Sequence, residues 1–394
     1  MRKVGTVVRG IRTPIIKEND NLEEIVVNSL MEASRDEGFE FNDRDVVAIT
    51  EAVVGISEGN FATLDDISTD IKNKLNSDHI GIVFPILSRN RFAVCLQGMA
   101  RCAKKITLLL SYPSDEVGND ILYKEDLKKY NVNPYSDIIT YDDYMEKYHH
   151  FVHPFTGVNM VDFYKELVEK EGCACEIVLS NNALDILKYT NDVITCDIHT
   201  RIETKELLTN NGANVISMAD ILSTSVNGSG YNEKYGLLGS NRATEERVKL
   251  FPRTGQKLVD KIQKRLKELT GKNIEVMVYG DGAFKDPVGK IWELADPVVS
   301  PAYTSGLEGS PNELKLKYLS ENKFKDLSGE ELNNAIREEI RSKNSNLKGT
   351  MASQGTTPRR YTDLIGSLCD LTSGSGDKGT PVVLIQHYFT NYSD

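Results

Sequence analysis

The chain has 394 residues, of which 40% are hydrophobic, and a formal net charge of -11. Its length exceeds the roughly 250–300 residues at which a single hydrophobic core usually stops growing, which favours two lobes. Non-specific binding to nucleic acid or to an anionic membrane needs clustered positive charge, so the acidic balance argues against both and favours a small-molecule substrate. Residues 1–10 contain no apolar signal-peptide core, and we expect a cytoplasmic protein.

Apolar runs typical of strands alternate with amphipathic helical patterns along the chain, which predicts an α/β fold. The predicted strands are Val46–Val54, Ile80–Phe84, Ile106–Leu110, Glu176–Leu179, Val193–Cys196, Val215–Met218, Ile274–Tyr279 and Val382–Ile385. The predicted helices are Leu22–Ala33, Arg91–Ala103, Val161–Lys170, Lys205–Leu208, Thr244–Leu269 and Tyr361–Leu371. The helix from Thr244 has acidic residues in its first turn, as the helix dipole favours, and Pro252 predicts a break or kink within it.

Two segments interrupt the alternation. Residues 114–156 are polar and rich in Asp, Tyr and Asn, and residues 308–358 form a charged, amphipathic helical pattern that ends in a loop. We interpret both as insertions in one module that spans residues 1–394. The core of this module is then expected at about 1–113, 157–307 and 359–394.

The most informative segment follows the predicted strand Ile274–Tyr279. The strand stops on Asp281, which lies between two glycines, and Asp286 follows five residues later with Lys285 between them. A carboxylate at the end of a strand points out of the sheet edge, and two carboxylates with a lysine are a common way to hold a metal against a phosphate. The alternative is a solvated aspartate in an ordinary turn.

Weaker candidates lie elsewhere in the chain. Residues 227–232 and 372–380 are Gly-rich and either surround a phosphate with backbone N–H groups or form plain turns. Neither matches the P-loop or dinucleotide fingerprints. His199 follows a predicted strand, at the position where ligand-contacting residues emerge in α/β folds. The Cys173-x-Cys175 pair is a candidate metal or redox site, against the alternative of buried thiols.

Three blocks near the N-terminus are N-D-N-L-E-E-I at 19–25, D-R-D-V-V-A-I at 43–49 and V-V-G-I-S-E-G-N at 53–60. Together they resemble the opening of a known family, the coenzyme F420-0:L-glutamate (γ-glutamyl) ligases. Further on, Y-G-D-G-A-F at 279–284 is similar to the family's S-D-T-F-G-R segment. The helix at 361–371 and the strand at 379–385 resemble the family's closing elements, and residues 217–227 loosely match its A-G-I-D-x-S-N segment.

The resemblance implies a mixed-sheet, two-lobed module that forms an intertwined homodimer. It also implies GTP with Mg²⁺ or Mn²⁺ as cofactors, and an amide bond made between L-glutamate and a carboxylic acid, coenzyme F420-0 or a related one, through an acyl phosphate. On this basis Asp281, Asp220, Glu58 and Asp286 are expected to bind metal, Lys285 and Asn227 to meet phosphate oxygens, and Ser57, Gly59, Gly282 and Asn227 to contact the nucleotide. Asp281 and Lys285 are the expected catalytic residues.

The chain departs from the family at positions that carry charge. Ala52 and Ile56 stand where the family has lysines, and Asn60 stands where it has an arginine. Phosphate and carboxylate ligands lose bidentate partners when arginine is replaced. We therefore expect the metal carboxylates to carry over better than the substrate pocket. A non-catalytic nucleotide or metabolite sensor and a metal-dependent phosphohydrolase are the two alternative functions.

Overall fold

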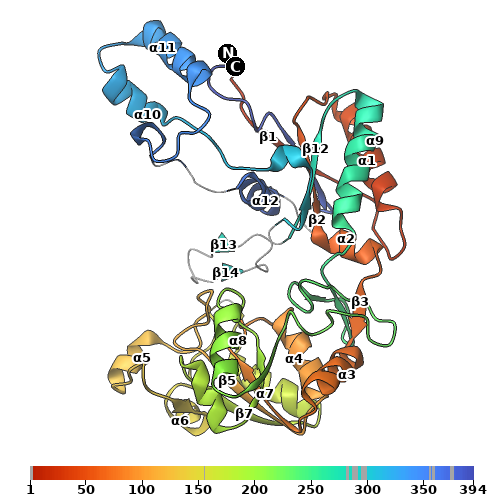
Figure 1. Cartoon of the computed structure of the whole chain (residues 1–394), viewed down its shortest axis with the longest axis vertical. Coiled ribbons are helices and arrows are strands. Elements are labelled where there is room, and N and C mark those ends of the chain that lie inside the picture. The colour runs from red at the N-terminus through yellow and green to blue at the C-terminus, as the bar shows by residue number, and fades with distance from the viewer. Residues whose placement is uncertain are drawn as a thin grey trace.

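A computed structural model describes residues 3–154, 156–280, 300–354, 356, 360–372 and 377–394, together with the backbone of two short strands at 284–285 and 292–293. Its strands form two large sheets, a three-stranded sheet and a two-stranded pair. The large sheets lie toward opposite ends of the molecule, and the three-stranded sheet lies near their junction (Figure 1). Helices and strands are mixed throughout, which confirms the predicted α/β class.

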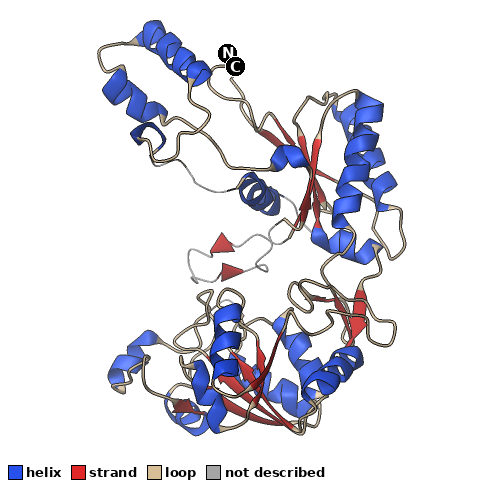
Figure 2. Ribbon diagram, viewed as in Figure 1, coloured by secondary structure: helices blue, strands red, loops and turns tan. Residues whose placement is uncertain are grey.

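The central strands of the five-stranded sheet are buried on both faces. In spatial order its strands are β1 (Val7–Ile11), β16 (Val382–Gln386), β2 (Val46–Thr50), β12 (Glu275–Tyr279) and β15 (Ala302–Tyr303). Helices α1 (Leu22–Glu37) and α9 (Gly255–Thr270) cover one face, and α12 (Tyr361–Thr372) covers the other (Figure 2). Burial on both sides explains why β2, β12 and β16 appear in the sequence as continuous apolar runs.

Strands β2 and β12 are parallel neighbours, although they are far apart in the sequence. Tyr279 of β12 lies opposite Thr50 of β2. Because parallel strands end at the same edge of a sheet, β12 ends at Tyr279 beside the point where β2 ends at Thr50. The antiparallel strand β16 begins at this edge, where the Thr50 amide donates to the Pro381 carbonyl at 3.0 Å. We refer to the edge at which β2 and β12 end as the β2–β12 edge.

The six-stranded sheet is a doubly wound unit. Its strands in spatial order are β6 (Ile139–Thr140), β7 (Ala174–Leu179), β5 (Lys105–Leu110), β4 (His79–Val83), β8 (Asp192–Thr195) and β9 (Asn214–Ser217). Every neighbouring pair is parallel except β6 with β7. Helices α4 (Phe92–Ala100) and α7 (Met160–Lys170) pack on one face, and the 3₁₀ helix η1 (Ala183–Lys188) and α8 (Arg201–Asn210) pack on the other. Helices on both faces of a parallel sheet define this architecture.

The three-stranded sheet connects the two large sheets. It consists of β10 (Asn241–Arg242), β11 (Arg247–Lys249) and β3 (Phe61–Thr63). Helix α2 (Glu51–Ser57) of the five-stranded unit packs against β11, and α3 (Leu64–Leu75) follows β3 and packs against α4 of the six-stranded unit. The three-stranded sheet therefore has packing partners in both halves of the molecule.

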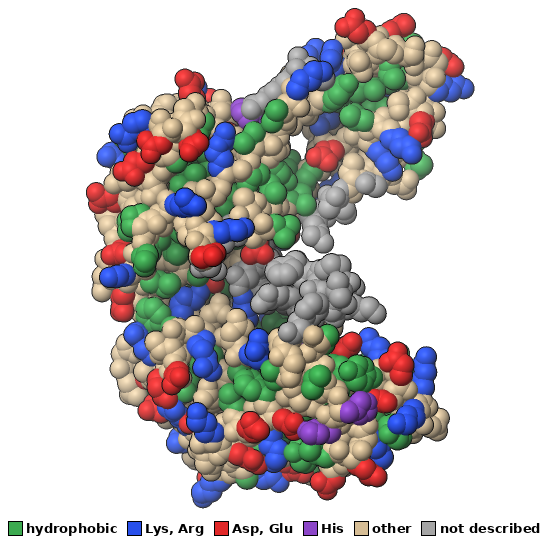
Figure 3. Space-filling model, turned by 180° about the vertical axis from the view of Figure 1, so that it is seen from behind, with side chains coloured by type: hydrophobic (Ala, Val, Ile, Leu, Met, Phe, Trp, Pro, Cys, Tyr) green, Lys and Arg blue, Asp and Glu red, His purple; other side chains and the backbone are tan. Residues whose placement is uncertain are grey.

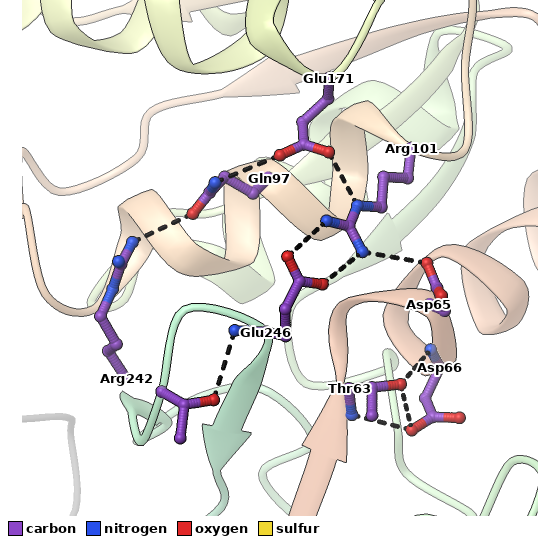
Figure 4. A network of polar contacts seen from close by, with 9 residues as sticks. Thr63, Asp65, Asp66, Gln97, Arg101, Glu171, Arg242 and Glu246 are labelled. Carbon is purple, nitrogen blue, oxygen red and sulfur yellow. Dashed lines mark hydrogen bonds and ion pairs between the residues drawn. The ribbon is translucent and has the colours of Figure 1, made fainter.

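Arg101, which follows α4, binds the turn between β10 and β11 to the six-stranded unit (Figure 4). Its guanidinium donates to Glu171 at 2.8 Å, to the two oxygens of Glu246 at 2.8 and 3.0 Å, and to Asp65 at 3.1 Å. The guanidinium in turn lowers the pKa of the Glu246 carboxyl. Charge-assisted bonds of this kind are stronger than neutral ones, so the network fixes the position of β11.

The two segments predicted as insertions have secondary structure of their own. Residues 114–156 contain α5 (Lys124–Lys129), β6 and α6 (Tyr141–Lys147), and Tyr144 and Tyr148 of this segment join the core of the six-stranded unit. Residues 308–358 contain α10 (Leu316–Tyr318), a π-helical turn (Leu319–Lys323), α11 (Gly329–Ser342) and a 3₁₀ turn (Met351–Ser353). Elsewhere, a 3₁₀ turn covers Ser305–Leu307, and β13 (Phe284–Lys285) pairs with β14 (Trp292–Glu293).

All eight predicted strands overlap a strand of the structure, but two predicted elements run into an element of a different kind. The run Val46–Val54 is a strand as far as Thr50, after which α2 begins. The predicted helix Thr244–Leu269 is wrong in its first part, because residues 247–249 form β11 and α9 begins at Gly255. Pro252 accounts for the late start, since proline lacks the N–H that a helix interior needs.

The surface carries both signs of charge. Acidic and basic side chains are interspersed over the face shown in Figure 3. None of the helices in the described part of the chain combines the length and the apolar content that crossing a lipid bilayer requires.

Candidate functional site

A buried ion pair lies at the β2–β12 edge. Glu51, the first residue of α2, directly follows β2, and Lys249 ends β11. The Lys249 ammonium donates to both Glu51 oxygens, at 2.7 and 2.6 Å. The side chains are 3% and 5% exposed. Removing two charges from water is costly, so the pair depends on this two-oxygen geometry.

Close packing of α2 against β11 brings the two charges together. A Cβ atom at Gly55 would lie 2.9 Å from the Leu250 carbonyl and 3.3 Å from the Lys249 side chain, closer than side chains normally approach. Glycine at this position lets the helix approach the strand. The Lys249 side chain then reaches the first turn of α2, where a negative charge is also favoured by the helix dipole.

Neither Glu51 nor Lys249 was identified from the sequence alone. The sequence did contain one indication of Glu51, which follows an apolar run just as Asp281 comes shortly after the run that ends at Tyr279. Its ion-pair partner Lys249 could not be inferred, since Lys249 lies within the stretch predicted as a helix.

The predicted nucleotide contacts Ser57 and Gly59 lie at the end of α2, on either side of the predicted metal ligand Glu58. The Ser57 hydroxyl donates to the Val54 carbonyl at 3.0 Å. Gly59 has a φ of +66°, and a Cβ there would meet the side chain of Glu18. The carboxylate of Glu58 accepts the backbone N–H groups of Arg253 and Thr254 at 2.9 and 2.8 Å, and also the Thr254 hydroxyl.

These contacts give Glu58 a local structural role. Thr254 is the residue before α9, so the Glu58 carboxylate lies at the amino end of that helix. A carboxylate there satisfies backbone donors and interacts favourably with the helix dipole. Glu58 therefore joins the end of α2 to the start of α9.

Asn60 hydrogen-bonds the Gly-rich stretch 227–232 to the end of α2. Its amide nitrogen donates to the carbonyls of Tyr231 and Phe251 at 3.1 and 2.7 Å, and its amide oxygen accepts the Tyr231 N–H at 3.0 Å. Gly230 donates its N–H to the Phe61 carbonyl at 2.7 Å, and a Cβ at Gly230 would lie within 2.6 Å of the Phe61 amide. The N–H groups of Gly230 and Tyr231 therefore donate to atoms of the protein itself. Asn227 is exposed, with a φ of +51°.

Asp220 lies in a different environment, directly after β9 of the six-stranded sheet. One of its oxygens accepts the Lys205 ammonium at 2.6 Å and the N–H and hydroxyl of Ser217 at 2.6 and 2.8 Å. Burial would raise the pKa of Asp220, but the Lys205 ion pair and the Ser217 hydrogen bonds outweigh it and lower the pKa. The structure gives Asp220 and Glu58 separate sets of partners.

The remaining predicted site residues fall in or beside the segment after β12. Asp281, Gly282 and Asp286 lie outside the described residues, and Lys285 lies in β13 with a side chain that is not described. Within the described ranges, no group of three or more His, Cys, Asp or Glu side chains gathers as a metal site would require. The described carboxylates therefore do not assemble a metal site by themselves.

In the Cys173-x-Cys175 pair, Cys173 is buried and Cys175 is half-buried. Burial raises the pKa of Cys173 to about 11 and that of Cys175 to about 12. The thiolate is the form that binds metals and reacts, and both thiols stay protonated at neutral pH.

Comparison with known proteins identifies one family. A family model described as F420-0:Gamma-glutamyl ligase matches residues 10–387, nearly the whole chain. A search of curated proteins finds no match. The matched range contains the six-stranded and three-stranded sheets and all of the five-stranded sheet except residues 7–9 of β1. It also contains every residue that the sequence predicts for the site.

The buried pair makes a testable contribution to stability. The Lys249→Met substitution leaves the Glu51 carboxylate buried without its partner, and breaking a buried pair in this way costs about 3–5 kcal/mol. We expect a loss of that size in the free energy of unfolding, measured by urea denaturation. The double variant Lys249→Met with Glu51→Gln removes the unpaired charge and should recover much of the loss.

The matched control is Arg265→Met, because Arg265 pairs at 3.2 Å with Glu268 on the exposed surface of α9. Its expected cost is below about 1 kcal/mol. Equal losses in Lys249→Met and Arg265→Met would contradict a special role for the buried pair.

Proposed function

The chain belongs to the F420-0:γ-glutamyl ligase family, and on this basis we propose that it joins L-glutamate to a carboxylic acid through an amide bond. The observation that carries the proposal is the family match over residues 10–387. The pairing of β2 with β12 supports it, because three of the sequence blocks that resemble the family overlap or follow these neighbouring strands. These blocks are 43–49, 53–60 and 279–284.

The proposed reaction has two steps. The γ-phosphoryl group of GTP moves to a carboxylate oxygen of the acid and gives GDP and an acyl phosphate. The glutamate amine then attacks the acyl carbon, an amide bond forms, and inorganic phosphate leaves with the former carboxylate oxygen. Phosphoryl transfer asks the protein mainly for positioning and charge neutralisation. Mg²⁺ or Mn²⁺ would supply the neutralisation, with Asp281 and Asp286 as the proposed ligands.

Two described residues would position the protein around the proposed site. Glu58 hydrogen-bonds the start of α9, and Asn60 hydrogen-bonds the loop 227–232. Both contacts fix the position of these segments near the end of α2. Asn60 as a residue is 1% exposed. A buried amide with three backbone partners does not replace an arginine that would bind an anion. We therefore propose that the acid differs from the one that the family usually binds.

A product assay tests the reaction. The protein is incubated with GTP, Mn²⁺, L-glutamate and a panel of carboxylic acids, and products are followed by mass spectrometry. We expect GDP and phosphate when glutamate and a suitable acid are both present, with a product heavier than the acid by one glutamyl residue. Nucleotide hydrolysis that is indifferent to glutamate and acid would support a phosphohydrolase. Metal-dependent nucleotide binding without turnover would support a sensor.

The metal assignment is tested by Asp281→Asn, which removes one negative charge with little change in shape. Groups outside the first shell of a metal already change its affinity about 10–100-fold, so we expect Mn²⁺-dependent GTP binding to weaken by about tenfold or more. Isothermal titration measures this. Asp260→Asn on α9 is the control, since Asp260 contacts Gln256 at 3.0 Å on an exposed surface. Wild-type affinity in Asp281→Asn would remove Asp281 from the site.

We also propose that this two-lobed module works as an intertwined homodimer. A dimer in which each chain completes the site of the other should bury more than about 2,000 Å² in total. Light scattering at micromolar concentration should therefore give about twice the chain mass. A particle near 44.0 kDa, the mass of one chain, would contradict the proposal.

A further inference from the structure

The six-stranded sheet has a topological switch point between β4 and β8. From β4 the chain adds β5 and β7 on one side of the sheet, and then crosses to place β8 and β9 on the other side. The connections after β4 and β8 leave toward opposite faces, because α4 and α8 lie on opposite faces. In open α/β sheets such a point forms a crevice at the carboxyl ends of the strands, where ligands bind.

A carboxylate from a third connection lies across this crevice. Glu116 follows β5, which neighbours β4 on the side opposite β8. One Glu116 oxygen accepts the N–H of Ile198, and the other accepts the N–H of His199 at 3.0 Å. These two N–H groups precede α8, so they form an anion-binding position at the start of that helix. Glu116 is itself exposed to solvent.

A pocket continues from the same position. Its cavity volume is about 40 Å³, and Ile198 is part of its wall. The pocket is lined mainly by apolar side chains with a few polar groups at Ser88, Arg91 and Ser240. An anion held at the Ile198 and His199 N–H groups would therefore have an apolar cavity beside it.

The chemistry of the crevice restricts the ligand. The connection after β4, residues 84–91, contains no glycine, and a dinucleotide pyrophosphate needs glycines there for close approach of the backbone. Two basic side chains are nearby, since Arg91 lines the pocket and Arg201 donates to the Ile198 carbonyl. One anionic group on a compact apolar body fits this combination better than a dinucleotide.

Two buried oxygens belong to residues that come just before Ile198 in the chain. The Asp197 Oδ1 and Thr195 Oγ1 atoms have no hydrogen-bond partner among the described residues. The two residues are 2% and 0% exposed. Burial raises the pKa of Asp197, which favours its neutral form and weakens its repulsion of a nearby anion. Buried polar atoms without partners are uncommon in folded proteins and mark positions where a water or a ligand group is expected.

We propose that the switch point of the six-stranded sheet is a binding site for a small ligand that carries one carboxylate or phosphate group on an apolar body. The anion of the ligand binds the Ile198 and His199 N–H groups, and its body enters the pocket beside Ile198. Glu116 holds the anion position when no ligand is bound. This site is separate from the β2–β12 edge, so the proposal does not depend on the ligase reaction.

Glu116→Ala tests the proposal, because it removes the internal competitor while leaving an exposed position that is expected to fold. The probes are benzoate and phenyl phosphate, with benzyl alcohol and acetate as controls that lack the charge or the ring. Binding is followed through the methyl NMR signals of Ile198 and Met218, which line the pocket. If Glu116 occupies the anion position about nine-tenths of the time, its removal raises the apparent affinity about tenfold.

The matched control is Glu125→Ala, since Glu125 is also exposed and lies in α5 of the same unit. The expected result is that a charged aromatic probe binds Glu116→Ala more tightly than either wild type or Glu125→Ala. Stronger binding of benzoate would identify a carboxylate ligand, and stronger binding of phenyl phosphate a phosphate ligand. Equal affinities in the two variants, no methyl shift with either probe, or equal binding of benzyl alcohol would overturn the proposal.

Discussion

The parallel pairing of β2 with β12 is the constraint on which the rest of the structure depends. The two strands are neighbours in one sheet, yet the whole three-stranded sheet and the six-stranded unit lie between them in the sequence. The entropy cost of closing a loop rises only slowly with its length, so a large intervening unit is thermodynamically tolerable. The pairing fixes the register of Tyr279 against Thr50 and thereby defines the edge at which β12 ends beside the start of α2.

Polar contacts then fix how the intervening unit returns to that edge. The buried pair between Lys249 and Glu51 joins β11 to the start of α2, and the Arg101 network joins the turn before β11 to α4 and α7. Both use charges whose partners are distant in the sequence. A misplaced β11 would leave a charge buried without its partner, so these contacts favour a single arrangement of the connecting sheet.

The overall charge makes local donors important. The proposed reactants of the ligase are all anionic, and the chain has a net charge of -11, so the field of the whole protein does not attract them. Recognition must come from local groups, such as the metal ions that we propose at the β2–β12 edge or backbone N–H groups at a helix start. At two such helix starts the structure places a protein carboxylate: Glu58 before α9 and Glu116 before α8. The difference is that Glu58 joins two elements of the core, whereas Glu116 crosses a crevice beside a pocket.

The sequence by itself determined the α/β class, the positions of the main strands and the family, because apolar runs and short motifs depend on neighbouring residues. It also placed Asp281 and His199 shortly after predicted strands, since both positions follow from where a strand ends. Only the tertiary structure decided the order of the strands, the switch point at β4 and β8, the pairing of Lys249 with Glu51 and the structural roles of Glu58 and Asn60. Each of these depends on which distant segments lie side by side, and the periodicity of a single segment contains no information about its partner.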